Sequence, residues 1–162
     1  MIRASIEEKG SPKQVKETFP TDLREQLATI PDYWHDKYLL GHFQTTAVSK
    51  YGYQQRTKKH NDKKQRLYGH RRPLEMSGAS KQSARQGIKL TVRRKSSQGL
   101  VEARGTMKVP KYFYYQPGGI DLQAELVATT KQEEEQMGKI YEERAQAAVA
   151  NRQHKKRRRR VR

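Results

Sequence analysis

Histidine is the residue type that comes closest to catalytic chemistry in this sequence. His35 and His42 are seven residues apart and could share one helix face, but a metal site would need a third ligand. His60 and His70 lie in a basic segment where a metal-dependent nuclease would need further acidic residues, and that segment offers only Asp62. We therefore expect His35 and His42 to lie at the surface or at helix ends, and we expect no enzymatic activity, metal or cofactor.

Two other segments have compositions that binding sites use. Residues 112–115 read Tyr-Phe-Tyr-Tyr, which could stack on nucleic-acid bases. Tyrosine is also enriched at protein interfaces, so a strand edge or a subunit contact explains this segment at least as well, and we favour that interpretation. Pro117-Gly118-Gly119 is typical of a turn, because it lacks the strand, lysine and helix that surround a phosphate-binding loop.

Positive charge is the strongest signal in the chain, and it is concentrated in two segments. The formal net charge is +18 over 162 residues. Residues 50–95 hold fifteen Lys or Arg against Asp62 and Glu75, and residues 151–162 hold eight with no acidic residue, so the rest of the chain is net acidic. Basic segments on a near-neutral body are suited to a polyanion or to an acidic protein surface.

The candidate contact residues for such a partner are cationic and fall in these two segments. In the internal segment they are Arg56, Lys58, Lys59, Lys63, Lys64, Arg66, Arg71 and Arg72. In the tail they are Lys155, Lys156, Arg157, Arg158, Arg159 and Arg160. The tail cluster is also compatible with a nuclear-localisation signal or a solvated chain end. Binding to phosphates would be salt-sensitive, because each neutralised phosphate releases a counterion.

The composition predicts a small core in one domain. Hydrophobic residues make up 33% of the chain, and the absence of cysteine excludes disulfides, thiolate metal sites and cysteine nucleophiles. Residues 1–10 hold no apolar run and no stretch approaches the roughly 20 apolar residues that span a bilayer, so we expect neither a secretion signal nor a membrane span. We predict an N-terminal arm over residues 1–19, a single domain over 20–150 and a polybasic tail over 151–162.

Helices are predicted towards both ends of the domain. The first begins at Thr21, and Pro31 ends or kinks it. A second helix carries Trp34, which we expect in the core, and ends near Gly52. The last helix begins after Thr130, and its apolar stripe runs to residue 149. The tail beyond this stripe is expected to fray without a partner, because like charges repel along a helix.

Between these helices the sequence predicts a loop and a sheet. Residues 54–72 hold almost no apolar side chains, which indicates a long basic loop inserted in the domain. Residues 88–93 and 101–109 alternate between apolar and polar and predict two strands joined by a hairpin turn, and residues 120–126 predict a further antiparallel strand. The expected fold class is α+β, with N-terminal helices, the long basic loop, an antiparallel β-sheet with a hairpin, and a C-terminal helix packed on the sheet.

Taken in order along the chain, these features resemble the tail-completion, or head-to-tail joining (neck), protein family of long-tailed bacteriophages. The resemblance covers about residues 30–150 and depends on the order and spacing of short motifs. These motifs are Trp34-His35, His42-Phe43 with Ala47, Lys50–Arg56, Lys64, Gly69–Gly78, the hairpin, Pro110-Lys111-Tyr112, Glu125-Leu126 with Thr129-Thr130, and the C-terminal helix. The N-terminal arm and the Arg-rich tail lie outside the family pattern.

The resemblance implies a virion structural protein that forms a ring, commonly sixfold, at the head–tail junction or tail end, with no enzymatic activity. Its implied partners are further copies of itself, other head, neck and tail proteins, and DNA in the channel, with no membrane. Its implied location is the virion, assembled in the host cytoplasm. A ring would also pair sheet edges that are otherwise open. Composition alone favours an alternative, a basic RNA-binding or ribosome-associated nucleic-acid-binding module.

Overall fold

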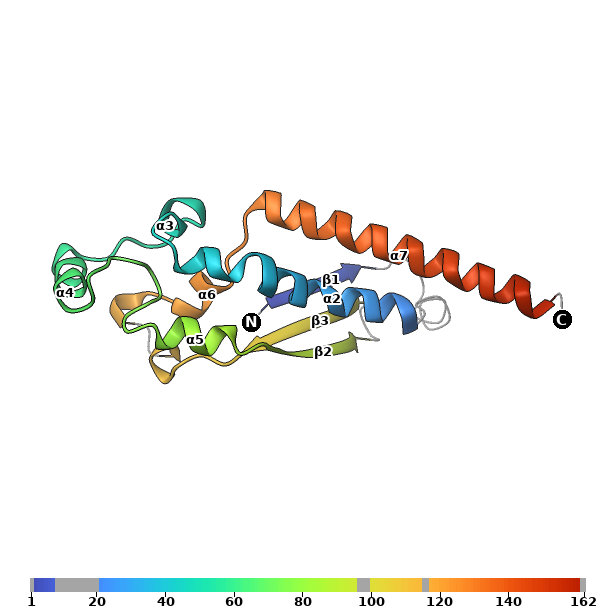
Figure 1. The fold of residues 1–162 in the computed structure, drawn as a ribbon, viewed down its shortest axis with the longest axis horizontal. Coiled ribbons are helices and arrows are strands. Elements are labelled where there is room, and N and C mark those ends of the chain that lie inside the picture. The colour runs from blue at the N-terminus through green and yellow to red at the C-terminus, as the bar shows by residue number, and fades with distance from the viewer. Residues whose placement is uncertain (1, 8–20, 96–99, 115–116, 161–162) are drawn as a thin grey trace. The chain divides into compact units, whose positions relative to one another are not determined.

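The computed structural model describes residues 2–7, 21–95, 100–114 and 117–160 (Figure 1). The chain divides into two compact units. The helical unit comprises Trp34–Lys89 and Thr106–Lys131, and the sheet unit comprises Ile2–Tyr33, Leu90–Gly105 and Gln132–Arg162. The sequence predicts one domain over residues 20–150, whereas that range contributes to both units.

The sheet unit contains three strands in the order β1-β3-β2. They are β1 (Ile2–Glu7), β2 (Ile88–Lys95) and β3 (Leu100–Met107), and the first two residues of β2 and the last two of β3 belong to the helical unit. Strand β1 pairs with β3 in the antiparallel sense, with Ile2 opposite Gly105 and Glu7 opposite Leu100. The antiparallel sheet and the strands of the predicted hairpin are thus confirmed, while its turn at residues 96–99 lies outside the described residues.

Strand β1 corrects the prediction of an N-terminal arm. Residues 2–7 alternate between apolar and polar, which is the pattern of a half-buried strand, but six residues at a chain end give a weak signal. Their partner, β3, lies almost 100 residues further along the chain, so local sequence does not reveal the pairing. The rest of the predicted arm, residues 8–19, lies outside the described residues.

The core of the sheet unit lies between β3 and two helices, α2 (Thr21–Lys37) and α7 (Lys131–Arg160). Val101 and Ala103 project from the same face of β3, because side chains alternate along a strand. They are buried with Leu27 of α2, and Tyr141 of α7 packs against this cluster. The prediction of a C-terminal helix packed on the sheet is therefore confirmed.

Helix α2 continues through Pro31, so the prediction that this proline could end the helix is wrong. A proline within a helix removes one backbone hydrogen bond. Here Pro31 is fully buried, and Leu27, Ile30 and Trp34 of the same helix are buried as well. The free energy gained by burying this apolar stripe offsets the lost hydrogen bond.

The helical unit is built from the end of α2 and short helices. These are η1 (Leu39–Phe43), α3 (Ala47–Lys50), α4 (Lys58–Tyr68), α5 (Ala79–Arg85), η3 (Lys111–Tyr114), η4 (Pro117–Gly119) and α6 (Leu122–Leu126). The central element is η1, which contacts α3, α5 and α6. The predicted second helix up to Gly52 is therefore replaced by η1 and α3. The predicted turn at residues 117–119 is confirmed, since Gly118 and Gly119 both have positive φ.

Helix α6 replaces the strand that we predicted over residues 120–126. Its N-cap is Asp121, whose carboxylate accepts hydrogen bonds from the backbone N–H groups of Gln123 (3.0 Å) and Ala124 (2.9 Å). Leu122 and Leu126 are both buried, and a spacing of four residues is compatible with either a strand face or a helix face. The Asp121 cap therefore favours a helix over a strand for this segment.

Helix α7 begins directly after Thr130, as predicted, but it continues through Arg160. The prediction that the tail frays is therefore wrong for residues 151–160. Arginine, lysine and glutamine are good helix formers, and the tail extends a helix that is already nucleated and packed at its N-terminal half. Extension of an existing helix avoids the nucleation step that makes isolated basic segments unstable.

Removal of residues 151–162 is expected to leave the fold intact. The last partly buried side chain of the apolar stripe is Ala148, and Val149, Ala150 and Asn151 are exposed. The thermal unfolding midpoint, measured by circular dichroism, should fall by less than about 2 °C. A drop of more than about 5 °C would show that the tail packs against the rest of the chain.

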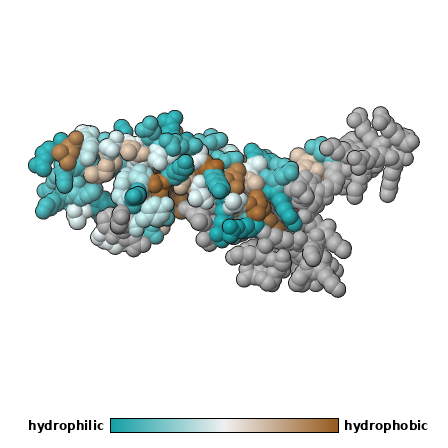
Figure 2. Space-filling view, turned by 90° about the horizontal axis from the view of Figure 1, so that it is seen from below, coloured by the Kyte–Doolittle hydropathy of each residue, from teal (hydrophilic) through white to brown (hydrophobic). Residues whose placement is uncertain are grey.

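The low apolar content of the chain is visible at its surface. The face drawn in Figure 2 is largely hydrophilic, and its apolar residues occur in small groups. Among the described residues, no helix has the length and apolarity needed to cross a membrane.

Candidate functional site

The most basic part of the helical unit is helix α4, which lies within the segment that we predicted as a loop. The Thr57 side chain caps its N-terminus by accepting a hydrogen bond from the His60 N–H (3.3 Å). Gly69 ends the helix in the left-handed conformation at φ 71°, and its N–H donates to the Gln65 carbonyl (2.9 Å). The loop prediction is therefore wrong for residues 58–68, because it relied on apolar periodicity and gave no weight to the two caps.

One side of α4 forms a basic face. We define this face by Lys58, Lys59, Lys63 and Arg66, which are all exposed. At 100° per residue they span an arc of about 140°, which also contains exposed Asp62, the partner of Arg71. None of the four forms an ion pair with a described residue, and like charges at a spacing of four residues, such as Lys59 and Lys63, destabilise a helix. A helix that retains this repulsion is suited to bind an external anion.

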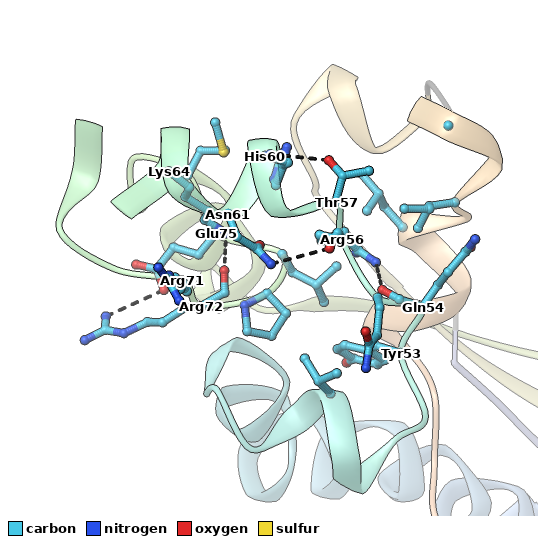
Figure 3. A pocket seen from close by; sticks show the side chains of 18 of the residues that line it. Tyr53, Gln54, Arg56, Thr57, His60, Asn61, Lys64, Arg71, Arg72 and Glu75 are labelled. Carbon is cyan, nitrogen blue, oxygen red and sulfur yellow. Dashed lines mark hydrogen bonds and ion pairs between the residues drawn. The ribbon is translucent and has the colours of Figure 1, made fainter. Parts of the chain in front are cut away.

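The other side of α4 borders a pocket of about 870 Å³ (Figure 3). Polar side chains line it from residues 53–57, from α4 and from residues 71–75, while Val48, Pro73, Leu74, Met76, Ile120 and Leu122 form its apolar walls. All of its lining residues belong to the helical unit. Its volume falls within the range of sites that hold small ligands or inserted side chains.

Lys64 is a buried cation in this pocket. Only 5% of its surface is exposed, and its Nζ donates a hydrogen bond to the carbonyl of Arg72. Burial, and secondarily the positive charge of Arg56, lower the pKa of Lys64 from 10.5 to about 8, although the Glu75 carboxylate acts in the opposite direction. The pocket thus holds a lysine whose charged form is stabilised less than in water.

Glu75 is the buried acid of the same pocket. It is 7% exposed, and its Oε2 accepts no hydrogen bond from the described residues. Its nearest cation is Arg72, whose Nη1 lies 3.7 Å from Oε2. The preceding residue, Leu74, has a positive φ of 54°, which is strained for leucine, and its carbonyl accepts a hydrogen bond from Ser80 Oγ (2.6 Å). Backbone strain of this kind is concentrated at functional sites.

Arg56 connects the pocket to helix α6 by a bidentate ion pair. Its Nη1 and Nη2 donate to Glu125 Oε1 (2.9 Å) and Oε2 (2.5 Å), and both side chains are largely buried. The Gln54 N–H also donates to Glu125 Oε1 (3.0 Å). A planar guanidinium in this geometry orients as well as attracts the carboxylate, so this pair holds one wall of the pocket in place.

His60 and Asp62, which were considered for nuclease chemistry, lie in different environments. Burial, followed by the charges of Lys64, Arg56 and Lys63, lowers the pKa of His60. Asp62 is exposed and pairs instead with Arg71 (Nη2 to Oδ1, 3.1 Å). In the part of the chain that the structure describes, no group of three or more His, Cys, Asp or Glu residues is placed to hold a metal ion.

His35 and His42 do not share a helix. His35 lies in α2, and its Nε2 is 2.8 Å from the carbonyl oxygen of Ala84 in α5. His42 lies in η1, is fully buried, hydrogen-bonds to Tyr53 through Nδ1 and stacks on the Tyr51 ring at 4.0 Å. Both histidines lie in the last turn of their helices, which confirms the helix-end prediction, and both hold elements of the helical unit together, although His42 is fully buried.

The structure divides the predicted contact residues into three groups. Lys58, Lys59, Lys63 and Arg66 form the basic face of α4. Arg71 and Arg72 lie at the rim of the pocket with about half of each side chain exposed, and Arg56 and Lys64 lie inside it. The side chains of the predicted tail residues 155–160 lie outside the described set. Of the aromatic segment, Phe113 is buried, Tyr112 lines the pocket, and Tyr115 is not described.

Sequence reasoning missed the two acids on which the site depends. Glu75 and Glu125 were read as parts of longer motifs, and neither was assigned to a basic partner. Glu125 lies 69 residues after Arg56, so nothing in the local sequence indicates this pair. For Glu75 a signal existed, because it is one of only two acidic residues in the basic stretch 50–95. An acid in such surroundings has a high chance of being paired or buried.

No protein-family model matches the chain, and neither a curated protein nor a solved structure shows significant similarity to it.

The pKa of Lys64 predicts a specific pH dependence of stability. Lys64 loses its proton near pH 8 in the folded chain and near pH 10.5 in the unfolded chain, so the unfolded chain binds more protons between these values. Burial of the charged lysine therefore destabilises the fold below pH 8, and this destabilisation decreases as the pH rises through the window. The unfolding free energy of the wild type relative to Lys64→Met should therefore increase by about 1–2 kcal/mol from pH 7 to pH 9.5. Urea unfolding of both proteins measures this, with Lys63→Met as an exposed control. Equal pH profiles for the wild type and Lys64→Met would contradict the prediction.

Proposed function

We propose that the protein is a structural protein of a bacteriophage virion, which acts at the head–tail junction or tail end. In this function it assembles into a ring with further copies, binds neighbouring virion proteins and catalyses no reaction. Two features support the proposal: the order of motifs along the sequence, and an α+β fold with a C-terminal helix packed on the sheet.

The observation that carries the proposal is the open sheet. In the order β1-β3-β2, each outer strand has one partner among the described strands. Strand β2 is eight residues long, and the side chain of its Val92 is 37% exposed. An edge strand presents backbone N–H and C=O groups that another chain can pair with. A ring uses two different surfaces of each copy, and two edges of one sheet provide such surfaces.

The mass of the purified protein in solution tests this proposal. Light scattering at low and high salt, with and without nuclease, should give a discrete oligomer that survives nuclease treatment. Val92→Lys should shift the protein towards the monomer, because a lysine on an edge strand opposes strand pairing. The neighbouring exchange Arg93→Lys keeps the charge and serves as the control. A protein that stays monomeric at all concentrations, also when mixed with virion head and tail proteins, would overturn the proposal.

A second candidate function, nucleic-acid binding, is favoured by one observation, the basic face of α4. Four exposed cations without ion pairs among the described residues match the footprint that neutralises phosphates. Within a ring this face could also contact DNA. The two functions therefore differ in whether the protein binds nucleic acid as a monomer or only after it has assembled into a ring. A monomer that carries nucleic acid at low salt and releases it at high salt would favour this second function.

Replacement of all four residues of the basic face by glutamine is expected to weaken DNA binding in a salt-dependent way. Each phosphate contact contributes about 0.9 to the slope of log K against log salt on duplex DNA, so the slope should fall in magnitude by about 3 to 4. Fluorescence anisotropy with a labelled duplex at several salt concentrations measures this. Lys131→Gln, at an exposed lysine of α7, is the control. An unchanged slope would exclude the basic face from DNA contact.

A further inference from the structure

We propose that the pocket of the helical unit is a docking site for an apolar side chain of a partner protein, carried on a segment with acidic residues on both sides. This inference depends on the proposed function, which requires contacts with neighbouring virion proteins, and it adds the site and the chemistry of one such contact. Three features of the pocket determine the occupant: its apolar walls, its buried carboxylate and its basic rim.

The walls of the pocket favour an apolar side chain. Val48, Met76 and Ile120 are partly exposed there, while Leu74 and Leu122 are nearly buried behind them. Covering these groups removes apolar surface from water, and this is the main favourable contribution at the centre of a protein interface. The sugar–phosphate backbone of a nucleic acid offers no comparable apolar group.

The buried carboxylate requires a hydrogen-bond donor. Glu75 lines the pocket, its Oε2 is buried without a hydrogen bond from the described residues, and Arg72 at 3.7 Å is too far away to supply one. A backbone N–H group next to the docked side chain would supply this donor when the Glu75 carboxylate turns towards the pocket on binding. A phosphodiester has no hydrogen-bond donor to offer this carboxylate, so the pocket fits a polypeptide better than a nucleic-acid backbone.

The rim of the pocket favours acidic residues on either side of the apolar one. Arg71 and Arg72 expose about half of their side chains at the rim of the pocket. The basic face of α4 is nearby, on the side of that helix that faces away from the pocket. Complementary charge at the rim of an interface increases the association rate and specificity. The occupant is therefore an acidic segment of a different virion protein.

The probe for this site is a fluorescein-labelled peptide with a central Leu-Phe pair and four Asp or Glu residues on each side. Two control peptides replace the acids by lysine or the Leu-Phe pair by serine. Fluorescence anisotropy with the full-length protein should show that the first peptide binds at least tenfold tighter than either control. Equal binding of the acidic serine peptide would mean that charge alone acts, and this would overturn the proposal.

Two protein variants locate the binding in the pocket. Glu75→Gln is nearly isosteric and directs an N–H₂ group or a weaker acceptor at the peptide, so affinity should fall about tenfold. Met76→Trp places a larger side chain at a partly exposed wall and should reduce binding by at least as much, without depending on the carboxylate. Lys131→Gln is the control for general charge effects, and circular dichroism confirms folding. Unchanged affinity in both pocket variants would overturn the proposal.

The outcomes also separate this inference from the proposed function. If unlabelled duplex DNA displaces the peptide from the wild type but not from the variant without the basic face, the two ligands meet on that face and the docking site is wrong. If the apolar acidic peptide does not bind at millimolar concentration while the protein still forms a discrete oligomer, the inference fails and the proposed function stands. If neither the peptide binds nor the protein assembles, both fail.

Discussion

Replacement of Trp34 by alanine is expected to lower the free energy of unfolding by about 3–5 kcal/mol. The sequence predicts Trp34 as a core residue, and the structure confirms this, because its side chain is 0% exposed. Its ring lies 5.2 Å from that of His42, which in turn stacks on Tyr51. Truncation would leave a cavity beside a stacked aromatic group that cannot collapse into the space. Chemical denaturation of the wild type and the variant measures the difference.

Trp34→Phe separates the volume of this side chain from its polar atom. The indole Nε1 is buried and has no hydrogen-bond acceptor among the described residues, so its removal relieves an unsatisfied donor. The phenylalanine variant keeps most of the ring and should lose no more than about 2 kcal/mol. A loss below about 1 kcal/mol for Trp34→Ala would show that the side chain is not in a tight core. Equal losses for both variants would indicate an unseen partner of Nε1.

Replacement of Glu125 by alanine is expected to destabilise the protein by about 3 kcal/mol. The exchange leaves the largely buried guanidinium of Arg56 without its bidentate partner and removes the acceptor of the Gln54 N–H. Lys64, Arg71 and Arg72 line the same pocket as Arg56, and Glu75 is the one carboxylate among the pocket-lining residues that the structure describes. An uncompensated charge is therefore left among cations, which is the costly way to break a buried pair.

A double-mutant cycle isolates this interaction. Arg56→Met and Glu125→Leu together remove both charges and keep apolar volume, so the double variant should be more stable than Glu125→Leu alone. We expect a coupling energy of about 2 kcal/mol from urea unfolding of the four proteins. Arg71→Met with Asp62→Leu is the matched control for an exposed pair, with an expected coupling below about 1 kcal/mol. Additive effects at Arg56 and Glu125 would show that the pair does not support the pocket wall.

Elements with a strong local signal were predictable from the sequence. Strands β2 and β3 follow from strict alternation, and the start of α7 follows from its N-terminal residues and its apolar stripe. Elements that depend on helix caps or on pairing with a distant strand were not predicted. Helix α4 is almost entirely polar and depends on Thr57 and Gly69, and β1 depends on a partner strand nearly 100 residues away.

The sequence by itself determined the α+β class, the concentration of charge in residues 50–95 and 151–162, and the burial of Trp34. These properties follow from composition and periodicity, which are local. Only the tertiary structure decided which cations face outwards on α4 and which, with Glu75, enclose a pocket. That division depends on a helix whose two sides differ and on Arg56 meeting Glu125 across 69 residues. Contacts of this range are made by folding of the whole chain, so no window of the sequence contains them.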